Sequence, residues 1–185
     1  MTIRTFEGIS PKIAASAYID EAAVVIGEVT IDADASLWPM VVARGDVQSI
    51  MIGARTNIQD GSILHVTSDN VFTPGGFALT IGDDVTVGHG AILHACTIGN
   101  LCLIGMGATV LDGAVVPERT MIGAGALVPP GKRLESGFLY IGSPVRQARS
   151  LKQAELDYLE FSSRHYVELK NKHLHSVGRG VRGKE

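Results

Sequence analysis

Aliphatic side chains recur at about every sixth position along most of the chain. The frame has 18 positions, and 17 of them are Ile, Val or Leu. Its members are Ile19, Val25, Ile31, Leu37, Ala43, Ile52, Ile58, Leu64, Ile81, Val87, Leu93, Ile98, Ile104, Val110, Val116, Ile122, Val128 and Leu134. A period of six matches neither the 3.6-residue repeat of an amphipathic helix nor the alternation of a half-buried strand. The pattern predicts short strands joined by tight corners, the signature of an all-β solenoid, the hexapeptide parallel β-helix.

The frame also predicts where the solenoid is interrupted. The resemblance of this frame to hexapeptide-repeat proteins implies that three hexapeptides make one triangular coil. The frame then predicts six coils, stacked at the usual strand spacing of about 4.8 Å. Three residues are inserted between Ala43 and Ile52, and 11 between Leu64 and Ile81. Because insertions in a solenoid become loops, we expect a loop at about residues 68–78 within a β-helix that covers residues 13–145.

The pattern changes after Leu134. The stretch from Ser150 to Gln153 resembles a capping box, the side-chain arrangement that opens many helices. We therefore expect an amphipathic C-terminal α-helix over residues 150–175 that packs on the solenoid. The last ten residues, 176–185, carry no apolar pattern and are expected to form a disordered tail.

Composition and charge narrow the classes of function. Apolar residues make up 45% of the chain and charged residues 19%, which excludes global disorder. A net charge of −3 gives no electrostatic reason to expect nucleic acid or an anionic membrane as a partner. No apolar run has the length of a membrane span, and the start lacks the pattern of a secretory leader, so we expect a cytoplasmic protein. The two cysteines, Cys96 and Cys102, are expected to be buried free thiols.

Three histidines carry the chemistry that the frame brings together. His65 and His94 each follow a frame residue directly, and they are 29 residues apart. That separation is one 18-residue coil plus the 11-residue insertion, so both side chains are expected on one face, one coil apart. Two imidazoles stacked at about 4.8 Å can bind one ion at the zinc–nitrogen distance of about 2.0–2.1 Å.

His89 occupies a different frame position. It is the second residue after Val87, which places it on the neighbouring face and directs it away from the other two histidines. A third ligand for the same ion must therefore come from another subunit. Three solenoids around a threefold axis would let His89 of one chain approach His65 and His94 of the next, so the spacing predicts a homotrimer with shared metal sites.

Polar residues surround this predicted site. Arg44 lies one coil before His65 on the same face, and Asp46 follows two residues later. Gln59 and Asp60 follow the frame residue Ile58, which places Asp60 one coil before His89.

Four stretches of the chain resemble γ-class carbonic anhydrases and their bacterial relatives. They are WPMVVARGD, RTNIQDGSILH, VGHGAILHACTIG and YIGSP, and the resemblance covers about residues 13–174. It implies a left-handed β-helix in which His65, His89 and His94 bind one metal ion across the subunit boundary of a homotrimer.

The resemblance also implies roles for the polar residues. Arg44 and Asp46 would form an ion pair near the subunit boundary, and Gln59 would contact the metal-bound water or bicarbonate. Asp60 would organise the surroundings of the metal ligands, and Tyr166, in the C-terminal helix, resembles a tyrosine near the site.

The implied reaction is the reversible hydration of CO2 to bicarbonate by a metal-bound hydroxide. Zn2+ is the expected cofactor, and Fe2+ or Co2+ are alternatives because imidazole suits all three ions. The archaeal prototype of the family carries two glutamates for proton transfer, at positions that are Val47 and Ser68 here. The efficiency of turnover is therefore open, with Asp69 as an alternative proton-transfer group.

Two other classes of function stay open at this point. Many hexapeptide solenoids are acyl-CoA transferases or thioesterases, which use one histidine as a general base and need no metal. The chain could also be a catalytically weak zinc-binding trimer with a structural role, because a bound ligand stabilises an assembly without any turnover.

Overall fold

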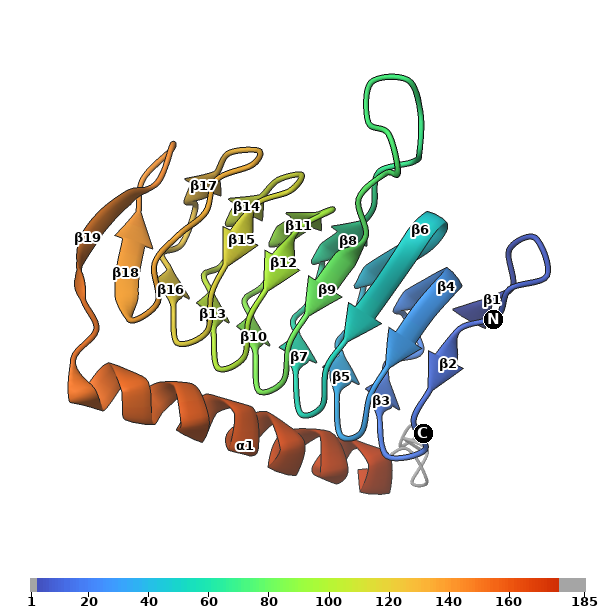
Figure 1. Ribbon diagram of the computed structural model, residues 1–185. Helices are drawn as coiled ribbons and strands as arrows, with labels where there is room; N and C mark the ends of the chain where they lie inside the picture. The colour runs from blue at the N-terminus through green and yellow to red at the C-terminus, as the bar shows by residue number, and fades with distance from the viewer. Residues whose placement is uncertain (1–2, 177–185) are drawn as a thin grey trace, which may run out of the picture.

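The computed structural model describes residues 3–176, and these residues form a left-handed parallel β-helix with a C-terminal helix (Figure 1). Short strands alternate with tight corners, as the period of six predicts, and each coil has three sides. The strands form an 8-stranded and an 11-stranded sheet. The larger sheet covers two sides of the solenoid, because its strands β4 (Val24–Ile31) and β6 (Val42–Ile52) bend around a corner between them.

The first side, here called the helix face, is the 8-stranded sheet. Its strands are β3 (Tyr18–Ile19), β5 (Ser36–Leu37), β7 (Asn57–Ile58), β10 (Thr86–Val87), β13 (Leu103–Ile104), β16 (Met121–Ile122), β18 (Phe138–Ile141) and β19 (Arg146–Ser150). The second side, here called the histidine face, consists of the first halves of β4 and β6 followed by β8 (Ile63–His65), β11 (Ile92–His94), β14 (Thr109–Val110) and β17 (Leu127–Val128).

The third side continues β4 and β6 beyond the corner. It contains β2 (Lys12–Ile13), the second halves of β4 and β6, β9 (Leu79–Ile81), β12 (Thr97–Ile98) and β15 (Val115–Val116). The short strand β1 (Ile3–Arg4) pairs with the first half of β4. Strand pairing thus extends beyond the six predicted coils at both ends, through β1 and β2 at one end and β18 at the other. Ile13 of β2 and Tyr140 of β18 keep the six-residue spacing, six residues before Ile19 and six after Leu134, whereas Ile3 of β1 lies off the frame.

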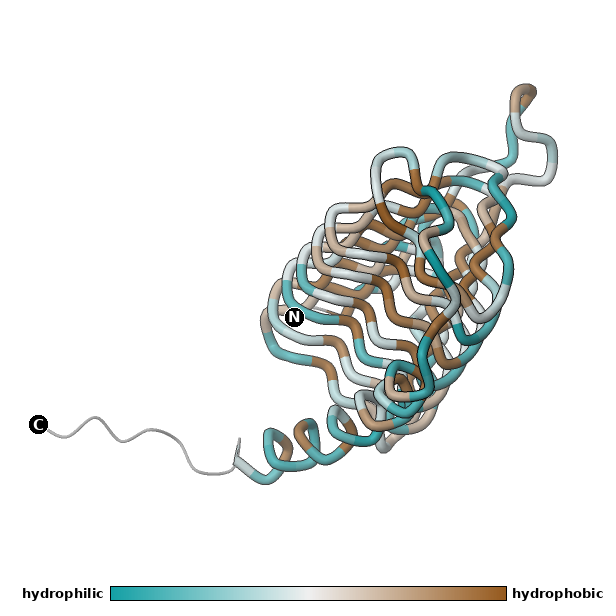
Figure 2. The backbone as a smooth tube through the Cα atoms, turned by 90° about the vertical axis from the view of Figure 1, so that its left-hand side faces the viewer, coloured by the Kyte–Doolittle hydropathy of each residue, from teal (hydrophilic) through white to brown (hydrophobic). Residues whose placement is uncertain are grey.

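The core is the stack of frame residues inside the coils, and Figure 2 shows apolar positions that line up from coil to coil. Seventeen of the 18 frame residues are buried, and Ile19 is partly buried. They stack in register from coil to coil, as in the ladder Leu64, Leu93, Val110 and Val128. Successive coils approach so closely at the corners that a Cβ atom on Gly105 would lie 2.5 Å from the backbone nitrogen of Ala124.

The helix α1 (Gln153–Ser176) runs along the solenoid against the helix face (Figure 1). The capping box expected from Ser150 to Gln153 is wrong, because Ser150 is the last residue of β19 and the helix begins at Gln153. Instead, the Glu155 carboxylate accepts a hydrogen bond from the backbone nitrogen of Lys152 at 2.8 Å and pairs with Arg149 at 2.7 Å. The carboxylate thereby satisfies a free N–H group of the first turn.

Polar contacts hold much of α1 in place. The Ser162 hydroxyl bonds to the Thr86 hydroxyl at 2.8 Å, and the buried Lys170 ammonium donates to Asp34 Oδ1 at 2.7 Å. No helix within residues 3–176 has the length and hydropathy of a membrane span. The tail expected at residues 176–185 lies, apart from Ser176, outside the described residues.

The predicted insertion is a loop that stands away from the solenoid (Figures 1 and 2). Its stem contains two antiparallel bridges, between Thr67 and Phe77 and between Asn70 and Thr73. The loop leaves the corner between the histidine face and the third side, directly after the strand that ends with His65.

Candidate metal site

His65 and His94 lie side by side at the ends of β8 and β11. The two residues are direct partners in the parallel pairing of these strands. Their rings are tilted, with centroids 5.1 Å apart, and His65 Nδ1 lies 3.0 Å from His94 Nε2. The coil spacing therefore brings two imidazole nitrogens close enough to bind the same metal ion.

Each of these rings is held by a carboxylate on its other nitrogen. His94 Nδ1 lies 2.6 Å from Asp112 Oδ1, and His65 Nε2 lies 3.2 Å from Asp46 Oδ1. Arg44 Nη1 in turn donates to Asp46 Oδ2 at 2.6 Å. This arrangement of carboxylate and imidazole orients histidine ligands in many metal sites.

Both carboxylates are held in their charged form. Burial disfavours ionisation of Asp112, but hydrogen bonds from Thr67 and His94 outweigh this effect and lower its pKa. Burial likewise opposes ionisation of Asp46, and hydrogen bonds from Arg44 and His65 lower its pKa overall. Two ionised carboxylates can only accept hydrogen bonds, so the facing ring nitrogens must carry protons.

The two facing ring nitrogens lie at a distance that suits one shared cation. Burial lowers the pKa of His65 and so favours its neutral form. A neutral imidazole carries one proton, and in His65 the contact with Asp46 takes it. His65 Nδ1 then presents a lone pair toward His94 Nε2 at 3.0 Å. Two nitrogens bound to one tetrahedral zinc ion lie about 3.3 Å apart, so the donors of this pair fit a metal ion.

A single chain does not complete such a site. Within residues 3–176, no three His, Cys, Asp or Glu side chains gather as a metal-binding group. His89 lies at the corner between the helix face and the histidine face, after β10, and its Nδ1 atom is 2.9 Å from Asp60 Oδ2. It is therefore separated from His65 and His94 by the width of the histidine face.

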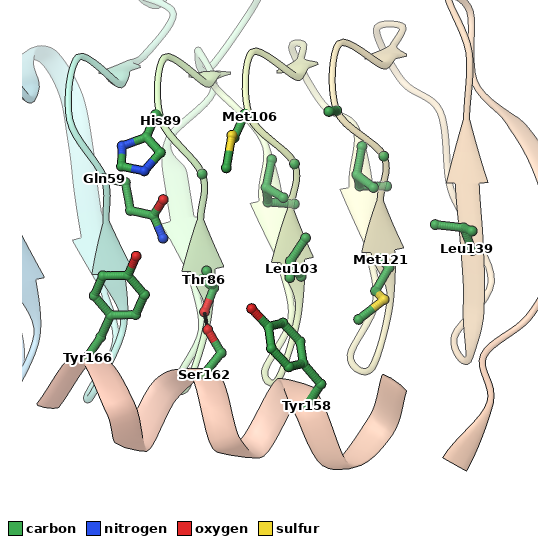
Figure 3. Close-up of a pocket in the computed structure, with 16 residues that line it drawn as sticks. Gln59, Thr86, His89, Leu103, Met106, Met121, Leu139, Tyr158, Ser162 and Tyr166 are labelled. Carbon is green, nitrogen blue, oxygen red and sulfur yellow. Dashed lines mark hydrogen bonds between the residues drawn. The ribbon is translucent and has the colours of Figure 1, made fainter. Parts of the chain in front are cut away.

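The remaining residues of the expected site gather around His89. Gln59, His89 and Tyr166 line a cavity of about 350 Å³ between the helix face and α1 (Figure 3). The buried Gln59 side chain donates to Asn57 Oδ1 at 3.1 Å. Burial raises the pKa of the Tyr166 hydroxyl, which stays protonated. We call this cavity the groove.

The expected site is thus divided between two corners of the chain. Arg44, Asp46, His65 and His94 lie at one end of the histidine face, and Gln59, Asp60, His89 and Tyr166 belong to the other end. Between the two corners, outward side chains form an apolar row in strand register: Val42, Ile63, Ile92, Thr109 and Leu127. Ile63 and Ile92 are 44% and 37% exposed.

The sequence interpretation missed two residues of this site, Asp112 and Thr67. Asp112 lies 18 residues after His94, whereas β11 and β14 pair with a separation of 17 residues, so Asp112 lies one residue beyond the position opposite His94. The Thr67 hydroxyl donates to Asp112 Oδ2 at 2.6 Å. Nothing in the frame marks Thr67, because it lies at the base of the inserted loop.

Curated relatives are similar to nearly the whole chain, although no protein-family model matches it. Protein YrdA of Escherichia coli is 54% identical over 172 residues, which cover 93% of this chain and 94% of YrdA. Gamma carbonic anhydrase 2, a mitochondrial protein of Arabidopsis thaliana, is 40% identical over 166 residues. The match covers 89% of this chain but only 59% of the plant protein.

Further relatives extend the same picture. Carnitine operon protein CaiE of Escherichia coli is 34% identical over 169 residues, or 91% of this chain and 83% of CaiE. Among solved structures, a hexapeptide transferase family protein from Anaplasma phagocytophilum is 40% identical with a TM-score of 0.85, covering 92% of this chain and 97% of that one. The chain therefore belongs to the family of hexapeptide-repeat proteins that includes YrdA, CaiE and this Anaplasma protein.

Proposed function

We propose that the chain forms a homotrimer that binds one metal ion at each subunit boundary and hydrates CO2 reversibly to bicarbonate there. The observation that carries this proposal is the 3.0 Å approach of His65 Nδ1 to His94 Nε2, with a carboxylate on the other nitrogen of each ring. The 40% identity with a plant protein named as a gamma carbonic anhydrase supports the choice of reaction.

The division of the site between two corners supports the trimer. If the histidine face of each chain faces a threefold axis, the His65 corner of one subunit adjoins the His89 corner of the next. The same packing removes the apolar row around Ile63 and Ile92 from water, which is favourable. The donor set becomes His65 and His94 with His89 of the partner subunit, the three-histidine set typical of catalytic zinc sites.

The chain's own residues have distinct tasks in this proposal. Asp46 and Asp112 hold the two ligand rings, and Asp60 holds the third. The partly exposed Arg44 supplies a positive charge near the site for bicarbonate. When bound, Zn2+, or alternatively Fe2+ or Co2+, lowers the pKa of a water ligand and supplies a nucleophile near neutral pH.

Proton release is the step for which the chain has the fewest suitable residues. Val47 and Ser68 stand where the archaeal relative has glutamates, and neither residue titrates. Asp69 Oδ1 already accepts a hydrogen bond from the backbone nitrogen of Gly75 at 2.8 Å. We therefore expect the buffer to take the proton, so that the hydration rate rises with buffer concentration.

A second candidate function is acyl transfer or thioester hydrolysis in the groove. The specific observation that favours it is the His89–Asp60 pair at 2.9 Å beside a 350 Å³ cavity, because a carboxylate-oriented histidine is a suitable general base. The transferase named among the solved relatives also supports this alternative.

Stopped-flow CO2 hydration by the oxygen-free, metal-loaded protein tests the proposal. We expect metal-dependent hydration, one metal ion per chain, and loss of both in His94→Ala. The matched control is His175→Ala, on the exposed end of α1, where Nδ1 contacts the backbone oxygen of Asn171.

Two results would contradict the proposal. Stoichiometric metal without hydration would reject CO2 as the substrate and favour the structural trimer. Hydrolysis of acyl-CoA thioesters that needs His89 but not His94 would instead favour the acyl-transfer class.

A further inference from the structure

The inserted loop presents two large apolar side chains to solvent at its tip. Val71 is 86% exposed and Phe72 is 91% exposed. Both lie at the end of the inserted loop, between the bridged residues Asn70 and Thr73, and Figure 1 shows that this loop stands away from the solenoid. Exposure of two such side chains in a row is unfavourable in water, and apolar surface of this kind marks interaction sites when it is held in place.

Hydrogen bonds hold this tip in a defined conformation. Asn70 Oδ1 accepts hydrogen bonds from the backbone nitrogens of Phe72 at 2.9 Å and Thr73 at 3.1 Å. Gln48 Nε2, from β6, donates to the backbone oxygen of Gly75 at 2.9 Å. These hydrogen bonds order the loop through the side chains of Asn70 and Gln48 and through backbone groups. The side chain of Phe72 takes no part in them and stays directed into solvent.

The base of the loop is part of the histidine corner. Thr67, the first bridged residue of the stem, also donates to the Asp112 carboxylate that holds His94. The stem runs from Thr67 to Asn70, which is about 10 Å at about 3.3 Å per extended residue. Phe72 thus projects by at least this length beyond the corner that contains His65.

The groove has an apolar surface at a similar distance, about 10 Å, from the corner that contains His89. Beyond His89 it is lined by Leu103, Met121 and Leu139 from the helix face and by Met106 at the corner after β13 (Figure 3). Thr86 on β10 also lines the groove and lies three residues before His89. The middle of the groove is therefore also about 10 Å from its corner.

We propose that Val71 and Phe72 of each subunit pack into the groove of the neighbouring subunit, so that a second copy of this chain closes each groove. This inference rests on the proposed trimer, in which the His65 corner of one chain adjoins the His89 corner of the next. The loop leaves the first corner, and the groove begins at the second. The same contact, repeated three times around a threefold axis, closes into a ring.

The contact would hold the subunits together and would also restrict access to the groove. Phe72 would cover the groove from the side opposite α1, next to Gln59 and Tyr166 of the partner subunit. Water would then reach the site by fewer routes, and the 350 Å³ cavity would not be open to a bulky acyl group.

Dissociation of the metal-loaded protein on dilution, followed by analytical ultracentrifugation, tests the contact. Burying a Phe side chain raises an association constant by about tenfold or more. We expect Phe72→Ser to raise the concentration of half-dissociation at least about tenfold. The matched control is Phe161→Ser, an exposed Phe on α1 that does not line the groove, and its effect should stay below about twofold.

Intermolecular disulfide formation locates the contact. We expect Phe72→Cys combined with Leu103→Cys to give covalent trimers on mild oxidation, and Phe72→Cys combined with Met51→Cys, on the third side, to give none. The native thiols of Cys96 and Cys102 do not interfere, because both are buried.

Two outcomes would overturn the inference, and they bear differently on the proposed function. A metal-loaded trimer that neither cross-links nor responds to Phe72→Ser would overturn the loop contact and leave the shared metal site intact. A chain that stays monomeric with its metal bound would overturn both.

Discussion

Asp112→Asn is the change that tests most directly how the chain prepares its histidines for a metal ion. The substitution keeps the size of the side chain and removes its charge. Asp112 Oδ1 lies 2.6 Å from His94 Nδ1, and Oδ2 accepts from Thr67 at 2.6 Å. An amide oxygen can still accept one of these hydrogen bonds. We therefore expect the coil to stay folded and the affinity for metal to fall.

The size of the effect follows from the hydrogen bonds. A hydrogen bond to a charged group contributes about 1.5–3 kcal/mol, and a neutral one about 0.5–1.5 kcal/mol. Replacing the charged acceptor by a neutral one therefore costs about 1 kcal/mol or more. Because the side chains of Asp112 and His94 are both 31% exposed, we use the lower value, about 1 kcal/mol. Since 1.4 kcal/mol is a factor of ten, we expect zinc to bind roughly 5- to 10-fold more weakly. Outer carboxylates of zinc-bound histidines typically contribute about 10- to 100-fold.

Competition with a chromophoric zinc chelator at pH 7.5 measures this change. The matched control is Asp20→Asn, because Asp20 also accepts two hydrogen bonds, from the Tyr18 hydroxyl at 2.8 Å and the backbone nitrogen of Ala22 at 2.9 Å, in a coil far from the histidines. Equal zinc affinity of Asp112→Asn and the unmodified trimer would refute the reasoning. An equal loss in Asp20→Asn would also refute it, because the effect would then be general.

Two further predictions concern stability and the thiols. Lys170→Met should lower the free energy of unfolding in urea by about 2 kcal/mol, since it leaves Asp34, which is partly exposed, without its buried partner. The exposed Lys172→Met should change it by less than about 0.5 kcal/mol, and equal effects would contradict the prediction. Burial raises the pKa of Cys102 to about 12 and that of Cys96 further. Neither thiol should therefore react with Ellman's reagent at pH 8 in the native protein, and labelling of either would contradict this. Unfolded thiols ionise near pH 8.5, so this contribution to stability should be complete below that pH and fall as the pH rises toward 12.

The frame predicts the fold well because the solenoid is a local structure. Each coil contacts mainly its neighbours, so one repeating rule places the buried residues from Val25 to Leu134. The same rule places His65 beside His94, because it counts coils and insertions. The rule fails at both ends, where β1 and β19 pair without the six-residue spacing, and at Ser150, where a β-strand continues through the expected helix cap.

The sequence by itself determined the coil, the place of the insertion and the face to which each histidine belongs, because spacing alone sets these features. Only the tertiary structure decided what each side chain contacts. It paired His94 with Asp112 and fixed the loop with Phe72 outward. These features depend on distances between side chains from different coils and from the inserted loop. A repeat of six residues specifies which side chains share a face, but it does not specify how far a loop reaches or which carboxylate turns toward a ring.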